Sequence, residues 1–269
     1  MMKKIRATFF DADGVLIKGG RFDSTPAELK EAVAELRESG VLFNLASGRP
    51  LFEQEELFRI ITGNAEPKPL EGILYEASAV KLWGDDQRYK VGGLNIQQIE
   101  DIEAFIICHS LFNGMVPQAN NRKYETQLGY VTPTFRSKGK TDKQLLKTVY
   151  HQVKPIIEAE FPFAQVGRSA DAVDIMAKGT SKDKPALEYS RITEISLANT
   201  AAIGDSDGDL PMLREVMKAG GRAAYVGEMP GHIIELTDYG NWFIKTNQFG
   251  PLGTVEFIRE ILKHNEMID

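Results

Sequence analysis

Short apolar runs alternate with segments of helical periodicity through the first part of the chain. Residues 7–10 and residues 41–46 are apolar runs that end in small or charged residues, which predicts two buried strands. Between them Leu29, Val33 and Leu36 recur at helical spacing and a glycine follows, which predicts a helix that ends there. A helix between two strands is typical of a crossover between parallel neighbours, so we expect both strands to end at the same edge of one sheet.

The pattern changes near residue 94. Isoleucine and phenylalanine side chains recur at helical spacing over residues 96–106, and a strand-like segment follows at residues 124–135. A second helix is expected over residues 141–160, and a closing hairpin over residues 164–176. Two helices and several strands in this order predict a small domain with a core of its own.

After this segment the alternation of strands and helices resumes, and it ends in an amphipathic helix over residues 254–262. The whole pattern predicts an α/β fold in which a doubly wound, Rossmann-like parallel sheet forms the core and a smaller α+β domain is inserted into it. We expect the core to comprise residues 1–86 and 178–269, and the inserted domain residues 87–177.

Composition limits the function classes that fit the chain. Its 269 residues, 42% of them hydrophobic, suffice for one large core and a second, smaller one. The formal net charge of -6, without any basic stretch, argues against nucleic acid as a partner. Cys108 is the only cysteine, so an intramolecular disulfide is excluded.

Membrane insertion and secretion are not expected either. No segment approaches the roughly 20 apolar residues that span a bilayer. Asp11 and Asp13 interrupt the first apolar run before it reaches the length of a secretion signal. We therefore expect a cytoplasmic protein without a membrane partner, and its oligomeric state stays open.

Acidic and hydroxyl residues follow the first two predicted strands. Asp11 and Asp13 come directly after the first strand, and two carboxylates at this spacing can divide the roles of nucleophile or metal ligand and proton carrier. Ser47, Gly48 and Arg49 come directly after the second, where a hydroxyl and backbone amides suit an anionic oxygen. Both groups are expected at the ligand-binding edge of the sheet.

A lysine and a second pair of acids occur much later in the chain. Lys182 lies just before a helix-like stretch, and Asp205 and Asp209 follow another short apolar run. An acid pair, a hydroxyl, a lysine and a second acid pair are together the residue types that an enzyme needs for phosphoryl transfer. On its own, each has a simpler interpretation: Lys182 as a solvated lysine, and Ser47 as a helix cap.

In this order the four segments resemble the motifs of the haloacid dehalogenase superfamily, and specifically the Cof-like phosphatases, which carry a large α/β cap between the second and third motifs. The resemblance implies that Asp11 is the nucleophile and Asp13 the general acid/base. It implies that Ser47 and Gly48 bind the phosphoryl group and that Lys182 neutralises charge. The implied ligands of Mg²⁺ are Asp11, Asp13, Asp205 and Asp209.

The chain departs from the family pattern at two places. Gly208 stands where relatives usually have Asn, and Ala77 and Ser78 stand where relatives commonly have an Asn-Gly pair. Both departures bear on substrate contacts more than on chemistry. For Arg49 two roles remain open, substrate binding and pairing with Glu53 one turn further on.

The function that the resemblance implies is Mg²⁺-dependent hydrolysis of phosphomonoesters of small metabolites, most often sugar phosphates, through an aspartyl phosphate. In the cap, Asn121 and Arg122 are the residues we expect to select the substrate. Two alternatives are a phosphosugar mutase that uses the same aspartyl phosphate, and a phosphoacceptor module without catalysis. The chain is long for a phosphoacceptor module, which would explain neither the inserted domain nor the second acid pair.

Overall fold

The chain forms two compact units, residues 1–91 with 181–269 (unit 1) and residues 92–180 (unit 2). The computed structural model describes residues 3–18, 21–85, 87–117, 125–138, 140–168, 172–226, 243–244 and 246–268. The sequence placed the inserted segment at residues 87–177, so the two junctions of the compact units come five and three residues later.

Unit 1 is built on one sheet whose strands run in the order β12-β11-β10-β1-β2-β3-β4-β5 in the described part of the chain. Every neighbouring pair from β12 to β3 is parallel, whereas β4 and β5 add to the edge as antiparallel strands. The strands are β1 Ala7–Phe10, β2 Leu42–Ser47, β3 Gly72–Tyr75, β4 Ala79–Leu82, β5 Arg88–Lys90, β10 Thr200–Gly204, β11 Arg222–Tyr225 and β12 Phe243–Ile244.

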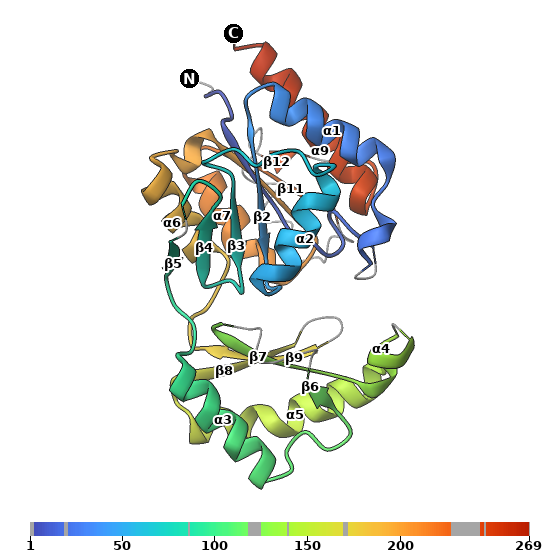
Figure 1. Cartoon of the computed structure of the whole chain (residues 1–269), viewed down its shortest axis with the longest axis vertical. Helices are drawn as coiled ribbons and strands as arrows, with labels where there is room; N and C mark the ends of the chain where they lie inside the picture. The colour runs from blue at the N-terminus through green and yellow to red at the C-terminus, as the bar shows by residue number, and fades with distance from the viewer. Residues whose placement is uncertain are drawn as a thin grey trace. The chain divides into compact units, whose positions relative to one another are not determined.

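Helices cover both faces of this sheet (Figure 1). Phe10 and its neighbours pack against α1, α2 and α9, whereas the adjacent Phe9 points to the opposite face and packs against α6 and α7. Because both faces are covered, the central strands β1, β2, β3 and β10 are buried almost along their whole length and do not alternate between apolar and polar residues. The helices are α1 Ala27–Glu38, α2 Leu51–Ile61, α6 Asp183–Thr193, α7 Leu210–Lys218 and α9 Gly250–Glu266, with short 3₁₀ helices η1 Phe22–Ser24, η3 Leu197–Asn199 and η4 Asp207–Asp209. The predicted doubly wound α/β core is confirmed.

Unit 2 is an antiparallel sheet with two long helices on one face (Figure 1). Its strands run in the order β6-β7-β9-β8, and their apolar side chains pack against α3 and α5. The elements are α3 Ile96–Cys108, β6 Val116–Pro117, β7 Gln127–Val131, α4 Pro133–Lys138, α5 Lys143–Glu160, β8 Ala164–Arg168 and β9 Ala172–Ala177. Unit 2 therefore has a core of its own, as the sequence predicted.

One predicted element of unit 2 is wrong in part. The strand expected over residues 124–135 ends at Val131, and the helix α4 begins at Pro133. Proline cannot donate a ladder hydrogen bond but fits the first turn of a helix, which explains the change of conformation there. In the described residues no helix combines the length and the apolar character that a bilayer span requires.

Candidate active site

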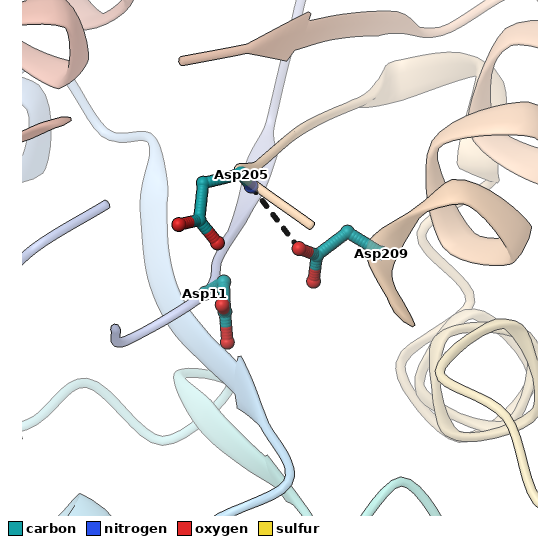
Figure 2. A group of neighbouring side chains, drawn as sticks. All are labelled: Asp11, Asp205 and Asp209. Carbon is teal, nitrogen blue, oxygen red and sulfur yellow. Dashed lines mark hydrogen bonds between the residues drawn. The ribbon is translucent and has the colours of Figure 1, made fainter. Parts of the chain in front are cut away.

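Three aspartates meet at the carboxyl-terminal edge of the sheet in unit 1. β1 and β10 are parallel neighbours in which Phe10 pairs with Ile203, so the residues that follow them emerge side by side. Asp11 and Asp205 follow these strands, and Asp209 ends η4 directly after them. The ligand oxygens of the three carboxylates all lie within 4.8 Å of one another (Figure 2). Such a set of hard oxygen donors suits Mg²⁺.

Lys182 joins two of these acids. Its Nζ donates to Oδ1 of Asp11 at 2.6 Å and to Oδ1 of Asp209 at 2.5 Å. The other oxygen of Asp209 accepts from the backbone N–H groups of Asp205 and Ser206 and from the Ser206 hydroxyl, at 2.8–3.1 Å. The carboxylate of Asp209 is thus held on both sides, and it is completely buried. Through its bond to Lys182, the fixed Asp209 carboxylate helps to hold the ammonium group beside Asp11.

Two glycines leave the space that these carboxylates occupy. A Cβ on Gly14, where φ is +72°, would lie 1.8 Å from Oδ2 of Asp205. A Cβ on Gly204 would lie 2.3 Å from the Cβ of Asp209. Neither glycine was given this role from the sequence. The signal that was available is their position directly beside the acidic pairs.

The charges in this cluster do not balance, because three carboxylates share one ammonium group. Burial raises the pKa of Asp11 to about 7, and the charge of Asp209 adds to this effect, while Lys182 partly offsets it. Burial and Asp209 also raise the pKa of Asp205, to about 6. Burial opposes the charge of Lys182, but Asp11 and Asp209 outweigh it and hold the pKa of the ammonium above its usual value. A divalent cation offsets the excess negative charge, so these residues fit Mg²⁺.

Ser47, Gly48 and Arg49, which the sequence pointed to, lie at the end of the neighbouring strand: Ser47 is the last residue of β2, and the other two follow it. β1 and β2 are parallel, and Phe10 pairs with Leu45, so Ser47 reaches the same sheet edge as Asp11. The buried Ser47 hydroxyl accepts a hydrogen bond from the backbone N–H of Arg49 at 3.4 Å. No heavy atom would approach within 4 Å of a Cβ on Gly48, so this turn is open on that side.

Asp13 is held differently from the other acids. Its two carboxylate oxygens accept from Nε and Nη2 of Arg49 at 2.7 and 2.8 Å. Among the described residues, the acidic group that can hold a metal comprises Asp11, Asp205 and Asp209, so the side chain of Asp13 lies outside it. Arg49 also pairs with Glu53 at 2.7 Å, the partner that the sequence suggested.

A tyrosine that sequence reasoning did not single out lies close enough to the acids for their charges to act on its hydroxyl. Tyr225 ends β11 and pairs with Gly204, directly before Asp205. Burial together with Asp205, Asp207 and Asp209 raises the pKa of its hydroxyl to about 12. In the sequence Tyr225 is simply the last residue of a short apolar strand, and no motif beside it indicates a role in the site. Asn121 and Arg122, which were expected to select the substrate, lie outside the described residues.

Comparisons with known proteins agree with this geometry. The sequence profile of the haloacid dehalogenase-like hydrolases matches residues 93–237, more than half of the chain. The matched segment includes Lys182, Asp205 and Asp209, whereas Asp11 and Ser47 precede it. No curated protein sequence matches the chain.

Solved structures resemble the chain over nearly its whole length. A haloacid dehalogenase-like hydrolase from Bacteroides thetaiotaomicron superposes with a TM-score of 0.70 at 16% identity, and the match covers 96% of this chain and 100% of that one. For protein 0175 of Thermoplasma acidophilum the TM-score is 0.68 at 19% identity, with 98% and 99% covered. For the sucrose-phosphatase of Synechocystis sp., solved with sucrose and phosphate, it is 0.62 at 15% identity, with 96% and 98% covered. At these identities the likeness concerns the fold.

Proposed function

Because this chain belongs to the haloacid dehalogenase-like hydrolases, we propose that it is a Mg²⁺-dependent phosphatase for phosphomonoesters of small metabolites, sugar phosphates in particular. The observation that carries the proposal is the setting of Asp11, a buried carboxylate that Lys182 contacts at 2.6 Å and that lies within 4.8 Å of two further acids. The sucrose-phosphatase of the same fold supports sugar phosphates as the substrate class.

Asp11 is the proposed nucleophile. A phosphate monoester dianion repels a carboxylate, so attack requires positive charge beside both groups. Lys182 supplies one charge, and the effect of Asp11 and Asp209 on its pKa keeps it protonated. Mg²⁺, when bound by Asp11, Asp205 and Asp209, would supply the remaining charge.

The proposed reaction has two half-reactions. A carboxylate oxygen of Asp11 forms a bond to phosphorus while the bond from phosphorus to the ester oxygen breaks, and the departing oxygen takes a proton from Asp13. Water then attacks the phosphorus of the aspartyl phosphate and gives its proton to Asp13, which releases phosphate and restores the Asp11 carboxylate. The Ser47 hydroxyl and the open turn at Gly48 are proposed to bind the phosphoryl oxygens.

Unit 2 is proposed to act as the cap that contacts the leaving group. Its insertion between Ser47 and Lys182 and its own hydrophobic core support this role. Asn121 and Arg122 remain the proposed selecting residues, on the basis of the sequence alone.

The test is release of inorganic phosphate from a panel of sugar phosphates and other phosphorylated metabolites, with Mg²⁺ and with a chelator. The nearly isosteric Asp11→Asn variant is expected to lower the rate about 10³-fold or more. Asp23→Asn serves as the matched control, because Asp23 is an exposed acid of the same unit that pairs with Arg21. An Asp11→Asn variant with most of the wild-type rate would contradict the assignment.

The same assay separates hydrolysis from the alternatives. A phosphosugar mutase would convert one sugar phosphate into another without releasing phosphate. A phosphoacceptor module would retain label on the protein without turnover. Activity that survives complete removal of divalent metal would contradict the proposed cofactor.

A further inference from the structure

The guanidinium group of Arg49 is held in place by contacts that do not involve Asp13. Nη1 donates to Oε2 of Glu53 at 2.7 Å, and the group lies 5.4 Å from the centre of the Phe22 ring. The backbone carbonyl of Arg49 accepts from Nε2 of Gln54 at 2.8 Å. Arg49 is thus fixed by α2 and by the segment before α1, whatever the side chain of Asp13 does.

Asp13 is then bound by the remaining edge of this guanidinium. Nε and Nη2 donate in parallel to its two oxygens, at 2.7 and 2.8 Å, which fixes both the position and the plane of the carboxylate. Each of the three nitrogens of Arg49 therefore donates to a carboxylate of the protein. The carboxylates of Asp13 and Glu53 offset the positive charge of the guanidinium, which disfavours the binding of a substrate phosphoryl dianion to the same group.

Stability does not explain the pair. The side chain of Asp13 is 48% exposed, compared with 20% for Arg49. Ion pairs with an exposed partner typically contribute between about 0 and 1 kcal/mol. The pair connects two loops at neighbouring strand ends, with Asp13 two residues after Asp11 and Arg49 two residues after Ser47. Its position at this edge of the sheet points to a role in the reaction.

We propose that Arg49 is a positioning residue for Asp13: its two parallel hydrogen bonds hold the Asp13 carboxylate in the orientation from which it exchanges protons with the leaving group and with water. This inference rests on the proposed function, in which Asp13 moves these protons. For Arg49, a positioning role takes the place of the two roles that the sequence left open, substrate binding and a simple pair with Glu53. The geometry requires the planar fork of arginine, because the ammonium of lysine cannot bind both oxygens in one plane.

The experiment is a double-mutant cycle of Arg49→Gln and Asp13→Asn, with kcat measured for an alkyl phosphate and for p-nitrophenyl phosphate. In the wild-type background Arg49→Gln is expected to lower kcat for the alkyl ester about 10- to 100-fold, as a misplaced group does. In the Asp13→Asn background the same change should cost less than about threefold, because the residue that it positions is gone. The loss should be smaller for p-nitrophenyl phosphate, whose leaving group needs no proton.

Further variants separate geometry, charge and folding. Arg49→Lys keeps the charge and should behave like Arg49→Gln, whereas rescue by lysine would contradict a role for the fork. Inhibition by inorganic phosphate should be unchanged in Arg49→Gln but weakened in Ser47→Ala. Arg59→Gln, at an exposed position on the same helix, is the matched control. Thermal unfolding of each variant shows whether a loss of kcat reflects a loss of structure.

The outcomes distinguish this inference from the proposed function. Additive effects of the two substitutions, together with weaker phosphate inhibition in Arg49→Gln, would show that Arg49 binds substrate and would overturn the inference alone. A wild-type protein that hydrolyses no phosphomonoester would contradict the proposed function instead. The Nε–H resonance of Arg49 in a ¹⁵N NMR spectrum tests the ion pair without catalysis. It should shift in Asp13→Asn, and an unchanged resonance would overturn the inference.

Discussion

At the scale of single residues, the proposed metal site depends on the absence of a side chain at Gly14. A methyl group there would lie 1.8 Å from Oδ2 of Asp205, and φ of +72° disfavours any residue with a Cβ. Gly14→Ala must therefore displace Asp205 from the other two acids. We expect the dissociation constant of Mg²⁺, measured by titration calorimetry, to rise about 10- to 100-fold, the cost typical of a disturbed ligand shell.

Gly208→Ala is the matched control for this prediction. A Cβ at Gly208 would lie 3.6 Å from the Ser206 hydroxyl, an ordinary contact, although the residue lies between Asp205 and Asp209. Its affinity for Mg²⁺ should stay within about threefold of the wild type, since surface changes without a special contact usually have small effects. Wild-type affinity in Gly14→Ala would show that Asp205 is not a ligand.

The convergence of the acids and the lysine in space is the part of the site that the sequence predicted best. Residues that follow neighbouring parallel strands must lie together, so Asp11, Ser47 and Asp205 meet at one edge for reasons of topology. The pairing of Arg49 with Asp13 could not be predicted in this way. It depends on where the end of a long side chain lies, and strand order does not determine that.

At the scale of elements, the turn between β3 and β4 is strained. Glu76 and Ala77 both have φ of +52°, and the Ser78 N–H donates to the carbonyl of Tyr75 at 3.1 Å, as in a type I′ hairpin turn. A left-handed conformation costs a residue with a Cβ about 1–2 kcal/mol, and glycine avoids this cost at an entropic expense of roughly 0.5–1 kcal/mol. Ala77→Gly should therefore raise the free energy of unfolding by about 0.5–1 kcal/mol in urea titrations.

The matched control is Ala79→Gly, two residues further along. Ala79 is buried in β4 and pairs with Tyr75, so glycine there only weakens the strand. This variant should be less stable than the wild type. Equal losses in the two glycine variants would show that the backbone strain at Ala77 is negligible.

Asp174 gives β9 a pH-dependent stability. It lies in the middle of the strand, between Gly129 and Gly167 on the two neighbouring strands, and desolvation of its half-buried side chain raises its pKa to about 7. In the unfolded chain an aspartate has a pKa near 3.9, so between these values the folded state binds the proton more tightly. Unfolding then releases a proton, and this contribution to stability is present at low pH and lost as the pH rises through about 7.

Asp174→Asn removes this dependence, because asparagine does not ionise. Urea unfolding of the variant and the wild type at pH 5 and pH 8 measures the difference. The variant should gain stability relative to the wild type at the higher pH. A difference that is the same at both pH values would contradict a raised pKa in the folded protein.

The elements that the sequence predicted correctly are those with one dominant signal. The first strands of the parallel sheet are mostly apolar and are separated by a periodic helix, so β1, α1 and β2 are confirmed close to their predicted bounds. The segment from Pro133 to Lys138 is short and carries no helical stripe, so its conformation depends on its surroundings in unit 2. Short segments of this kind are where local propensity gives way to tertiary contacts.

At the scale of the whole molecule, the two units have separate hydrophobic cores. The core of unit 2 combines side chains from α3, α5 and the strands β7, β8 and β9, and among the described residues it shares none with the cores of unit 1. The three acids of the proposed metal site all belong to unit 1. A ligand that binds only the folded form of one unit stabilises that unit and not the other.

Mg²⁺ is therefore expected to stabilise unit 1 selectively. At a free concentration 100 times its dissociation constant, it should raise the free energy of unfolding of unit 1 by about 2.7 kcal/mol. Trp83 and Trp242 are the only tryptophans in the sequence. Trp83 packs against the core of unit 1, so tryptophan fluorescence during thermal unfolding of a Trp242→Phe variant reports this unit. Hydrogen exchange of peptides from α5 and β9 reports unit 2, and it should be unchanged by Mg²⁺.

Ile175→Ala, which opens a cavity in the core of unit 2, should speed that exchange and leave the Mg²⁺-dependent fluorescence shift as it is. Equal protection of both units by Mg²⁺ would show that they unfold as one cooperative structure, and the separate cores would then not be separate units of stability.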